Sequence, residues 1–310
     1  MNWKTAHQMA MIRAAQFMRD AGAEGSEYVD VFAILAAAGV TCMAQPLDGL
    51  AGAYVGPTSS GPAVIVNSDL GEIALRQTAA HEAGHHAFGH SDRLDERADP
   101  DHGTLGTPLP NEEKLAEAFA AWLLMPRRAV LAAMCRAQVT RPATAADVHQ
   151  VACWLGTSFA GTARHLINLR LAGPTQAAAW TREWHGRGQR IRAALAAGPG
   201  SPPDRVWLIG PAADQAVLHV LPGDCLMCPG GYTPEHLPCG LRRRDQGQPV
   251  LGGHVPLDVT AALAGRSRLD LRGPGGCPPL ALTLLSPPVR LGIDSAWQPR
   301  QPSSLPQEEP

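Results

Sequence analysis

The sequence predicts an α+β protein. A mainly helical N-terminal domain with a small β-sheet leads into a helix-turn-helix-like subdomain, and a smaller β-rich domain follows. Two observations predict this class. Helical segments with recognisable capping signals recur through the first 172 residues. Beyond residue 203, short apolar runs are separated by glycine and proline, as in small β-domains. The 310 residues, 45% of them hydrophobic, are enough for two domains with ordinary cores.

The N-terminal domain begins with two predicted helices, at residues 1–20 and 28–38. Residues 50–55 and 63–67 then read as the two strands of a hairpin. We expect one strand of this hairpin to form a sheet edge, where an extended peptide could add as a further strand through main-chain hydrogen bonds.

A third helix is predicted from Glu72 to about Gly89, because this stretch lacks proline and is rich in alanine. Ser68 or Asp69 is the expected cap, and Glu72 follows Asp69 by three residues, as a capping box requires. A polar loop at residues 91–111 comes next, and it contains several prolines.

A fourth helix is predicted to start with Asn111 as its N-cap and to end at Pro126. Residues 144–171 then show a helix, a short turn and a second helix, with Arg164, His165 and Arg170 expected on or near the exposed face. DNA binding is one interpretation of this pattern. A packing pair of helices is preferred, because the formal net charge is −2 and no basic arm flanks the pair.

The C-terminal half changes character at residue 173. Tryptophans and arginines there suggest a helical connector, and a Gly/Pro/Ser-rich stretch at 198–203 indicates a linker. The tail is rich in proline, glutamine and serine, which is typical of disorder. The predicted boundaries are 1–172 for the first domain (including the subdomain 144–171), 173–203 for the connector and linker, 204–296 for the β-rich domain and 297–310 for the disordered tail.

Residues 81–85 read His-Glu-Ala-Gly-His, the H-E-x-x-H pattern of zinc proteases. Positions i and i+4 share one face of a helix, so His81 and His85 can offer imidazole nitrogens to one metal ion. Glu82 lies beside the first histidine, placed to take a proton from the attacking water. The pattern falls well inside the third predicted helix, where this geometry holds.

A catalytic zinc usually has a third protein ligand. Metzincins place a glycine and a histidine three and six residues after the second histidine. Phe88 and Ser91 occupy those positions here, which excludes that class. A carboxylate from the fourth helix is the other common solution, and Glu113 and Glu117 lie one turn apart on it. Either can point at the metal.

Four segments together resemble the ImmA/IrrE family of zinc metallopeptidases over roughly residues 28–172, about half of the chain. The first is Gly-Leu-Ala-Gly-Ala-Tyr at 49–54, and the second is the strand that ends in Asn67. The others are Arg-Gln-Thr-Ala-Ala-His-Glu-Ala-Gly-His at 76–85 and Phe-Ala-Ala-Trp-Leu-Leu-Met-Pro at 119–126.

The resemblance implies that His81, His85 and Glu113 hold one zinc ion and that Glu82 is the general base. The family usually has asparagine where this chain has Glu117, so Glu117 remains the alternative ligand. Manganese or iron can occupy similar nitrogen and oxygen sites. The oxyanion of the reaction needs a further donor, for which the candidates are Tyr54, His90 and His102.

The resemblance also implies a substrate: a transcriptional repressor of the XRE helix-turn-helix type, whose cleavage derepresses stress-response or mobile-element genes. Some family members carry a sensory, GAF-like domain in the place of residues 204–296. The alternative functions are a DNA-binding regulator with a non-catalytic metal site and a partner that holds the repressor without cutting it.

No export signal or membrane-spanning apolar run is visible, and seven cysteines without an export signal favour a reduced, cytoplasmic protein. Direct DNA binding and a membrane partner are therefore not expected. Four cysteines of the C-terminal half allow a second, structural zinc site with His236, but their spacing matches no strong zinc pattern and ordinary thiols are the preferred interpretation. They are Cys225, Cys228, Cys239 and Cys277.

Overall fold

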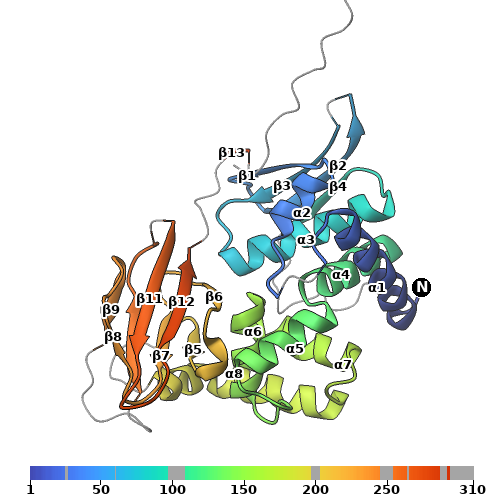
Figure 1. Ribbon diagram of the computed structural model, residues 1–310. Helices are drawn as coiled ribbons and strands as arrows, with labels where there is room; N and C mark the ends of the chain where they lie inside the picture. The colour runs from blue at the N-terminus through green and yellow to red at the C-terminus, as the bar shows by residue number, and fades with distance from the viewer. Residues whose placement is uncertain are drawn as a thin grey trace, which may run out of the picture. The chain divides into compact units, whose positions relative to one another are not determined.

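The computed structural model describes residues 1–24, 27–59, 61–96, 109–196, 203–244, 254–263, 265–286 and 292–293. The chain is an α+β protein, as predicted (Figure 1). It divides into two compact units. Unit 1 comprises Met1–Ala23, Asp30–Ala120 and Arg290–Pro310, and unit 2 comprises Glu24–Val29 and Ala121–Val289. The domain boundaries at residues 172 and 203 stay a prediction.

The sheet of unit 1 has the strand order β13-β1-β3-β2-β4. β1 is parallel to β3, and the other neighbours are antiparallel. The predicted hairpin is present as β2 and β3. The strands are β1 (Thr41–Gln45), β2 (Leu50–Thr58), β3 (Gly61–Asn67), β4 (Arg93–Glu96) and β13 (Gly292–Ile293).

Two expectations about this sheet are wrong. Both hairpin strands are interior, since β3 lies between β1 and β2, and β2 lies between β3 and β4. Neither can be the edge that takes a substrate. Residues 93–96, expected in a polar loop, form β4 because their backbone pairs with β2. In the described part of the chain, β4 and β13 are the edges.

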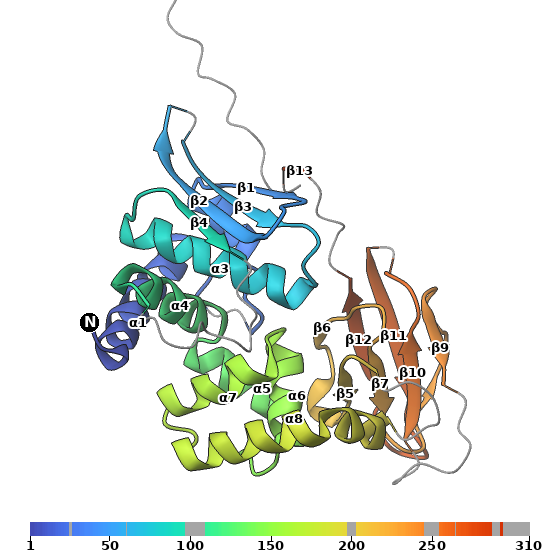
Figure 2. The same ribbon diagram turned by 180° about the vertical axis from the view of Figure 1, so that it is seen from behind.

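The helices of unit 1 are α1 (Trp3–Asp20), α2 (Val31–Ala37), α3 (Glu72–Phe88) and most of α4 (Asn111–Leu124). α3 runs across one face of the sheet, and α4 lies against α3 (Figure 2). The capping prediction for α3 is wrong. The N-cap is Gly71, which has no side chain to make a capping bond, and the helix starts at Glu72, so Ser68 and Asp69 lie too early in the chain to be its N-cap.

Unit 2 combines helices with two small sheets, in the orders β5-β7-β10-β9 and β6-β12-β11-β8. Alternate residues of β12 are buried, as expected for a sheet with one face in the core. Its helices are α5 (Arg127–Arg136), α6 (Ala145–Leu155), α7 (Phe159–Asn168) and α8 (Pro174–Ala196). Its strands are β5 (Val206–Leu208), β6 (Val217–His219), β7 (Cys225–Cys228), β8 (Thr233–Pro234), β9 (Leu241–Arg243), β10 (Val255–Val259), β11 (Arg266–Arg272) and β12 (Leu280–Leu285).

α6 and α7 occupy the segment that was predicted as two helices around a turn. Thr144 and Asp147 form a capping box on α6, and Gly156 ends that helix in the left-handed region at φ 63°. Arg164 is exposed, but the expected exposure of His165 is wrong. His165 is 1% exposed, because its ring packs against Trp122 and its Nε2 lies 3.0 Å from the carbonyl oxygen of Met125, both at the end of α4.

The four cysteines considered for a second zinc site do not form a metal-binding cluster among the described residues. Cys225 and Cys228 are buried in β7, and burial raises the pKa of each thiol to about 12. Cys239 and Cys277 are exposed. Among the described residues, no group of histidine, cysteine and acidic side chains in unit 2 is close enough to share a metal ion. The tail 297–310 lies outside the described residues.

Taken singly, no helix in the described part of the chain has the length and apolarity of a membrane span. The consecutive segments Asn111–Leu124 and Arg127–Arg136 pass that test only as a bent pair, by length and composition alone.

Candidate metal centre

The two histidines of the motif lie on one face of α3. The Nε2 atoms of His81 and His85 are 3.2 Å apart, as expected for side chains one helical turn apart. His85 is fully buried, whereas the His81 side chain is 14% exposed. The pair therefore presents one ring nitrogen that is fully buried and one that is partly accessible to solvent.

Glu113, from the first turn of α4, completes the group. Its Oε2 lies 3.2 Å from Nε2 of His81 and 3.6 Å from Nε2 of His85. The helices can approach this closely because Gly84 faces α4. A Cβ atom at Gly84 would lie 2.8 Å from the Cα of Ala116 and 3.2 Å from the Cβ of Phe119. The glycine inside the motif thus brings the carboxylate of one helix to the histidines of the other.

The three side chains fit a metal ion. Their ligand atoms all lie within 4.8 Å of one another, and among the described residues they are the only such group found. Two imidazole nitrogens and a carboxylate oxygen are a common donor set of catalytic zinc, whose tetrahedral ligand atoms lie about 3.3 Å apart. The separations here are 3.2 to 3.6 Å. One proton can bridge only two of these acceptor atoms, while a cation can bind all three.

The electrostatics of the site favour an anionic carboxylate. Hydrogen bonds from His81 and His85 hold the pKa of Glu113 well below its usual range, and they outweigh the opposing effect of burial. Glu113 is therefore ionised at neutral pH and offers a negative charge to a cation.

Glu82 lies on the side of α3 that faces the sheet, and it is fully buried. Its position depends on Gly52 in β2. A Cβ atom at Gly52 would lie 2.8 Å from Oε1 of Glu82 and 2.5 Å from Cγ2 of Thr78. Only glycine leaves space for the carboxylate between helix and strand.

Glu117 lies one turn beyond Glu113 and contacts a different nitrogen. Its Oε2 is 3.8 Å from Nδ1 of His81, the ring nitrogen that does not face His85 and Glu113. Its side chain is 40% exposed, against 21% for Glu113. The geometry favours Glu113 over Glu117 as the third ligand.

The three candidate oxyanion donors have different positions. The Tyr54 hydroxyl lies 3.2 Å from Nδ1 of His86, and burial followed by the charge of Asp92 raises its pKa, so it stays protonated. Nδ1 of His90 lies 2.9 Å from Nδ1 of His85. His102 lies outside the described residues. The role of these groups as oxyanion donors stays a prediction.

The sequence reasoning missed Gly52 and Gly84 as site residues. Glycines inside a strand and inside a helix are themselves signals of close backbone approach. What they approach depends on which elements pack together, and the sequence does not reveal that.

The helix that carries H-E-x-x-H and a glutamate from the following helix together form a group that could hold one metal ion. Residues 35–152 match the family model of the IrrE N-terminal-like domain, Peptidase_M78. The predicted resemblance to ImmA/IrrE peptidases is thereby confirmed for this domain. No curated protein matches the chain in sequence.

Proposed function

We propose that the chain is a zinc-dependent endopeptidase. The observation that carries this proposal is that Nε2 of His81, Nε2 of His85 and Oε2 of Glu113 lie within 4.8 Å of one another. Glu82, whose carboxylate is buried, directly follows His81 in the sequence. A zinc ion held by these atoms would supply Lewis-acid chemistry, polarising the scissile carbonyl and lowering the pKa of water towards about 7.

Glu82 is the proposed general base. Its carboxylate takes the proton of the attacking water and later passes that proton to the leaving amine. The adjacent His81 fixes where Glu82 lies along the helix, and Gly52 fixes its distance from the sheet. Burial by the sheet holds the carboxylate in one place, which lowers the cost of reaching a reactive geometry.

The substrate is proposed to bind as an extended segment along β4. β4 is an edge strand and pairs with β2, the strand that contacts α3. An edge strand offers unpaired main-chain groups to an added strand. The strand order supports this proposal, which replaces the expectation that β2 or β3 forms the edge.

The protein substrate is proposed to be a repressor of the XRE helix-turn-helix type, in the cytoplasm, with derepression of stress-response or mobile-element genes as the outcome. The resemblance to ImmA/IrrE peptidases supports this identity. The peptidase domain supports a protein substrate in general.

Two assays separate the activity from the substrate. The first incubates the purified chain with a mixed peptide library, with zinc or with chelator, and maps new termini by mass spectrometry. We expect metal-dependent cleavage that falls about 10²–10⁴-fold in Glu82→Gln, since this change removes the base but keeps the side-chain shape. Retention of zinc by Glu82→Gln is the control.

The second assay replaces the library with a purified XRE-type repressor encoded near the gene. A single metal-dependent cut supports the proposed substrate. Library cleavage without repressor cleavage rejects the repressor but keeps the peptidase. Absence of cleavage in both assays, with zinc bound, overturns the peptidase and leaves a regulator that binds DNA or holds the repressor.

A further inference from the structure

His85 uses both of its ring nitrogens. Its Nε2 lies 3.2 Å from Nε2 of His81, inside the candidate metal centre. Its Nδ1 lies 2.9 Å from Nδ1 of His90, on the opposite side of the ring. His85 is fully buried and His90 is half-buried, so the contact is partly shielded from water.

The positions of the ring protons in this contact follow from the fact that a neutral histidine carries one proton on its two ring nitrogens. A neutral histidine that offers the lone pair of Nε2 to a metal carries its proton on Nδ1. His85 therefore donates from Nδ1, and Nδ1 of His90 accepts. Since His90 is then neutral as well, its own proton sits on Nε2. Only this arrangement satisfies both rings while Nε2 of His85 faces His81 and Glu113.

The fold holds His90 in place by several local contacts. Gly89 ends α3 in the left-handed region at φ 68°, which turns the chain so that the N–H of His90 bonds the carbonyl of His85 at 3.0 Å. The His90 ring also stacks on Phe88, with centroids 5.8 Å apart and planes 17° apart. Backbone and ring thus both fix Nδ1 of His90 against His85.

We propose that His90 is a positioning residue of the metal centre: by accepting the Nδ1 proton of His85, it fixes the tautomer and ring orientation that direct Nε2 of His85 at the metal. This inference rests on the metal centre of the proposed function, not on catalysis. In this inference His90 is the hydrogen-bond partner of the ligand His85, and it is not the donor that stabilises the oxyanion of the reaction.

The outer nitrogen of His81 is held less tightly. Its neighbour is Glu117, at 3.8 Å and 40% exposed. Partners on the outer nitrogen of a ligand histidine typically change metal affinity 10–100-fold when removed. The contact of His85 with His90 is shorter than that of His81 with Glu117, so its loss should matter more.

Three variants test the proposal. His90→Phe keeps an aromatic ring against Phe88 but removes the acceptor. His90→Asn restores an acceptor, because Oδ1 of asparagine occupies nearly the position of Nδ1 of histidine. His90→Ala removes both ring and acceptor. Zinc affinity is measured by competition with a chromophoric chelator, and the visible spectrum of the cobalt-substituted protein reports the ligand geometry.

We expect zinc affinity to fall about 10–100-fold in His90→Phe and His90→Ala, and to return to within about threefold of wild type in His90→Asn. The cobalt spectrum should change in the first two and be restored in the third. Equal melting temperatures of the zinc-free Phe and Asn variants exclude a general loss of packing.

Wild-type zinc affinity in His90→Phe overturns the proposal, as does a loss in His90→Asn as large as in His90→Phe. Failure of the proposed function looks different. Zinc binding that depends on His90, without any peptide cleavage, keeps this inference and rejects the peptidase. Absence of zinc binding by the wild-type chain rejects both.

Discussion

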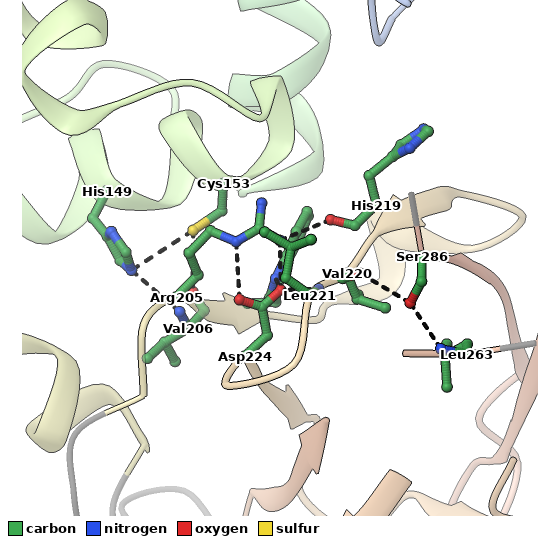
Figure 3. A network of polar contacts seen from close by, with 11 residues as sticks. His149, Cys153, Arg205, Val206, His219, Val220, Leu221, Asp224, Leu263 and Ser286 are labelled. Atoms are coloured by element: carbon green, nitrogen blue, oxygen red, sulfur yellow. Dashed lines mark hydrogen bonds and ion pairs between the residues drawn. The ribbon is translucent and has the colours of Figure 1, made fainter. Parts of the chain in front are cut away.

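The candidate metal centre of unit 1 and the polar cluster around Asp224 in unit 2 are both groups of converging polar side chains, but they differ in the chemistry of those side chains. Asp224 is 1% exposed and accepts two bonds from Arg205, at 2.9 and 2.6 Å (Figure 3). Its Oδ2 also accepts from the Trp207 indole and from the N–H of Leu221. Each acceptor there faces a donor of the same chain.

In the candidate metal centre, two imidazole nitrogens and a carboxylate oxygen face one another. Nε2 of His81, Nε2 of His85 and Oε2 of Glu113 converge at separations of 3.2 to 3.6 Å. A buried carboxylate is costly unless it is paired or binds a metal. Asp224 is paired with Arg205 of the same chain, whereas His81, His85 and Glu113 form a group that could hold a metal ion. This difference separates a structural polar cluster from a binding site more clearly than burial does.

Asp224→Ala should have the largest effect on stability. Removing one partner of a buried ion pair leaves Arg205 uncompensated and costs about 3–5 kcal/mol. Asp224→Asn, which keeps an acceptor, should cost less. Denaturant unfolding measures both, and zinc affinity serves as the control because none of these residues belongs to the metal centre. A loss of zinc affinity matching the loss of stability would break the contrast between the two clusters.

Gly52→Ala should affect the metal centre instead. The added methyl would meet Thr78, Oε1 of Glu82 and the carbonyl of Ile65, at 2.5, 2.8 and 3.0 Å. A displacement of Glu82 by about 1 Å can cost up to about 10²-fold in kcat. Peptide cleavage at saturating zinc measures this. Gly71→Ala is the matched control, because its methyl would meet open space, and unchanged cleavage in Gly52→Ala would contradict the assigned role of Glu82.

Unit 2 should also lose stability in acid through His149. Burial, followed by the charges of Arg192 and Arg205, lowers its pKa to about 3, below the ordinary value of 6.5. Below about pH 6.5, His149 binds a proton in the unfolded chain but stays neutral in the folded chain. Its contribution to the free energy of unfolding is therefore complete above that pH, and it declines by up to about 1.4 kcal/mol per pH unit as the pH falls towards 3.

His149→Gln isolates this effect. Its amide can accept the bond that the Val206 N–H donates to Nε2 of His149 at 3.2 Å, but it does not titrate. The difference in unfolding free energy between wild type and variant should therefore shrink or reverse between pH 7 and pH 5. Parallel pH profiles would show that His149 does not titrate as described.

Much of the fold could be predicted because the signals are local. Thr144, Gly156 and Ser158 mark the ends of α6 and α7 by their own capping chemistry. Short strands carry no such signal. β4 exists through pairing with β2, and β13 through pairing with β1, some 250 residues earlier in the chain. Residues 292–293, assigned to the β-rich domain from sequence, therefore belong to the sheet of unit 1.

In the candidate site too, features set by local sequence were predictable, and features set by the packing of distant segments were not. The helix period places His81 and His85 on one face, so their meeting was predictable. The helix pattern alone could not choose between Glu113 and Glu117, because both flank the same apolar stripe of α4, and only the family resemblance indicated Glu113. The choice depends on how closely α3 and α4 approach, and that distance is fixed where Gly84 meets Ala116. The contact of His90 with His85 likewise depends on the left-handed turn at Gly89.

Glu117→Asn should have the smallest effect on zinc affinity. It compares the partner of His81 with the partner of His85 inside the candidate metal centre. The contact of Glu117 with Nδ1 of His81 is long and solvent-exposed, and exposed ion pairs contribute little. We expect zinc affinity to change less than about threefold, against the 10–100-fold expected when the partner of His85 is removed. Chelator competition under identical conditions measures both. Glu113→Gln is the reference for a true ligand, and its affinity should collapse. If Glu117→Asn weakens zinc as strongly as Glu113→Gln, Glu117 reaches the metal and the choice of Glu113 alone is wrong.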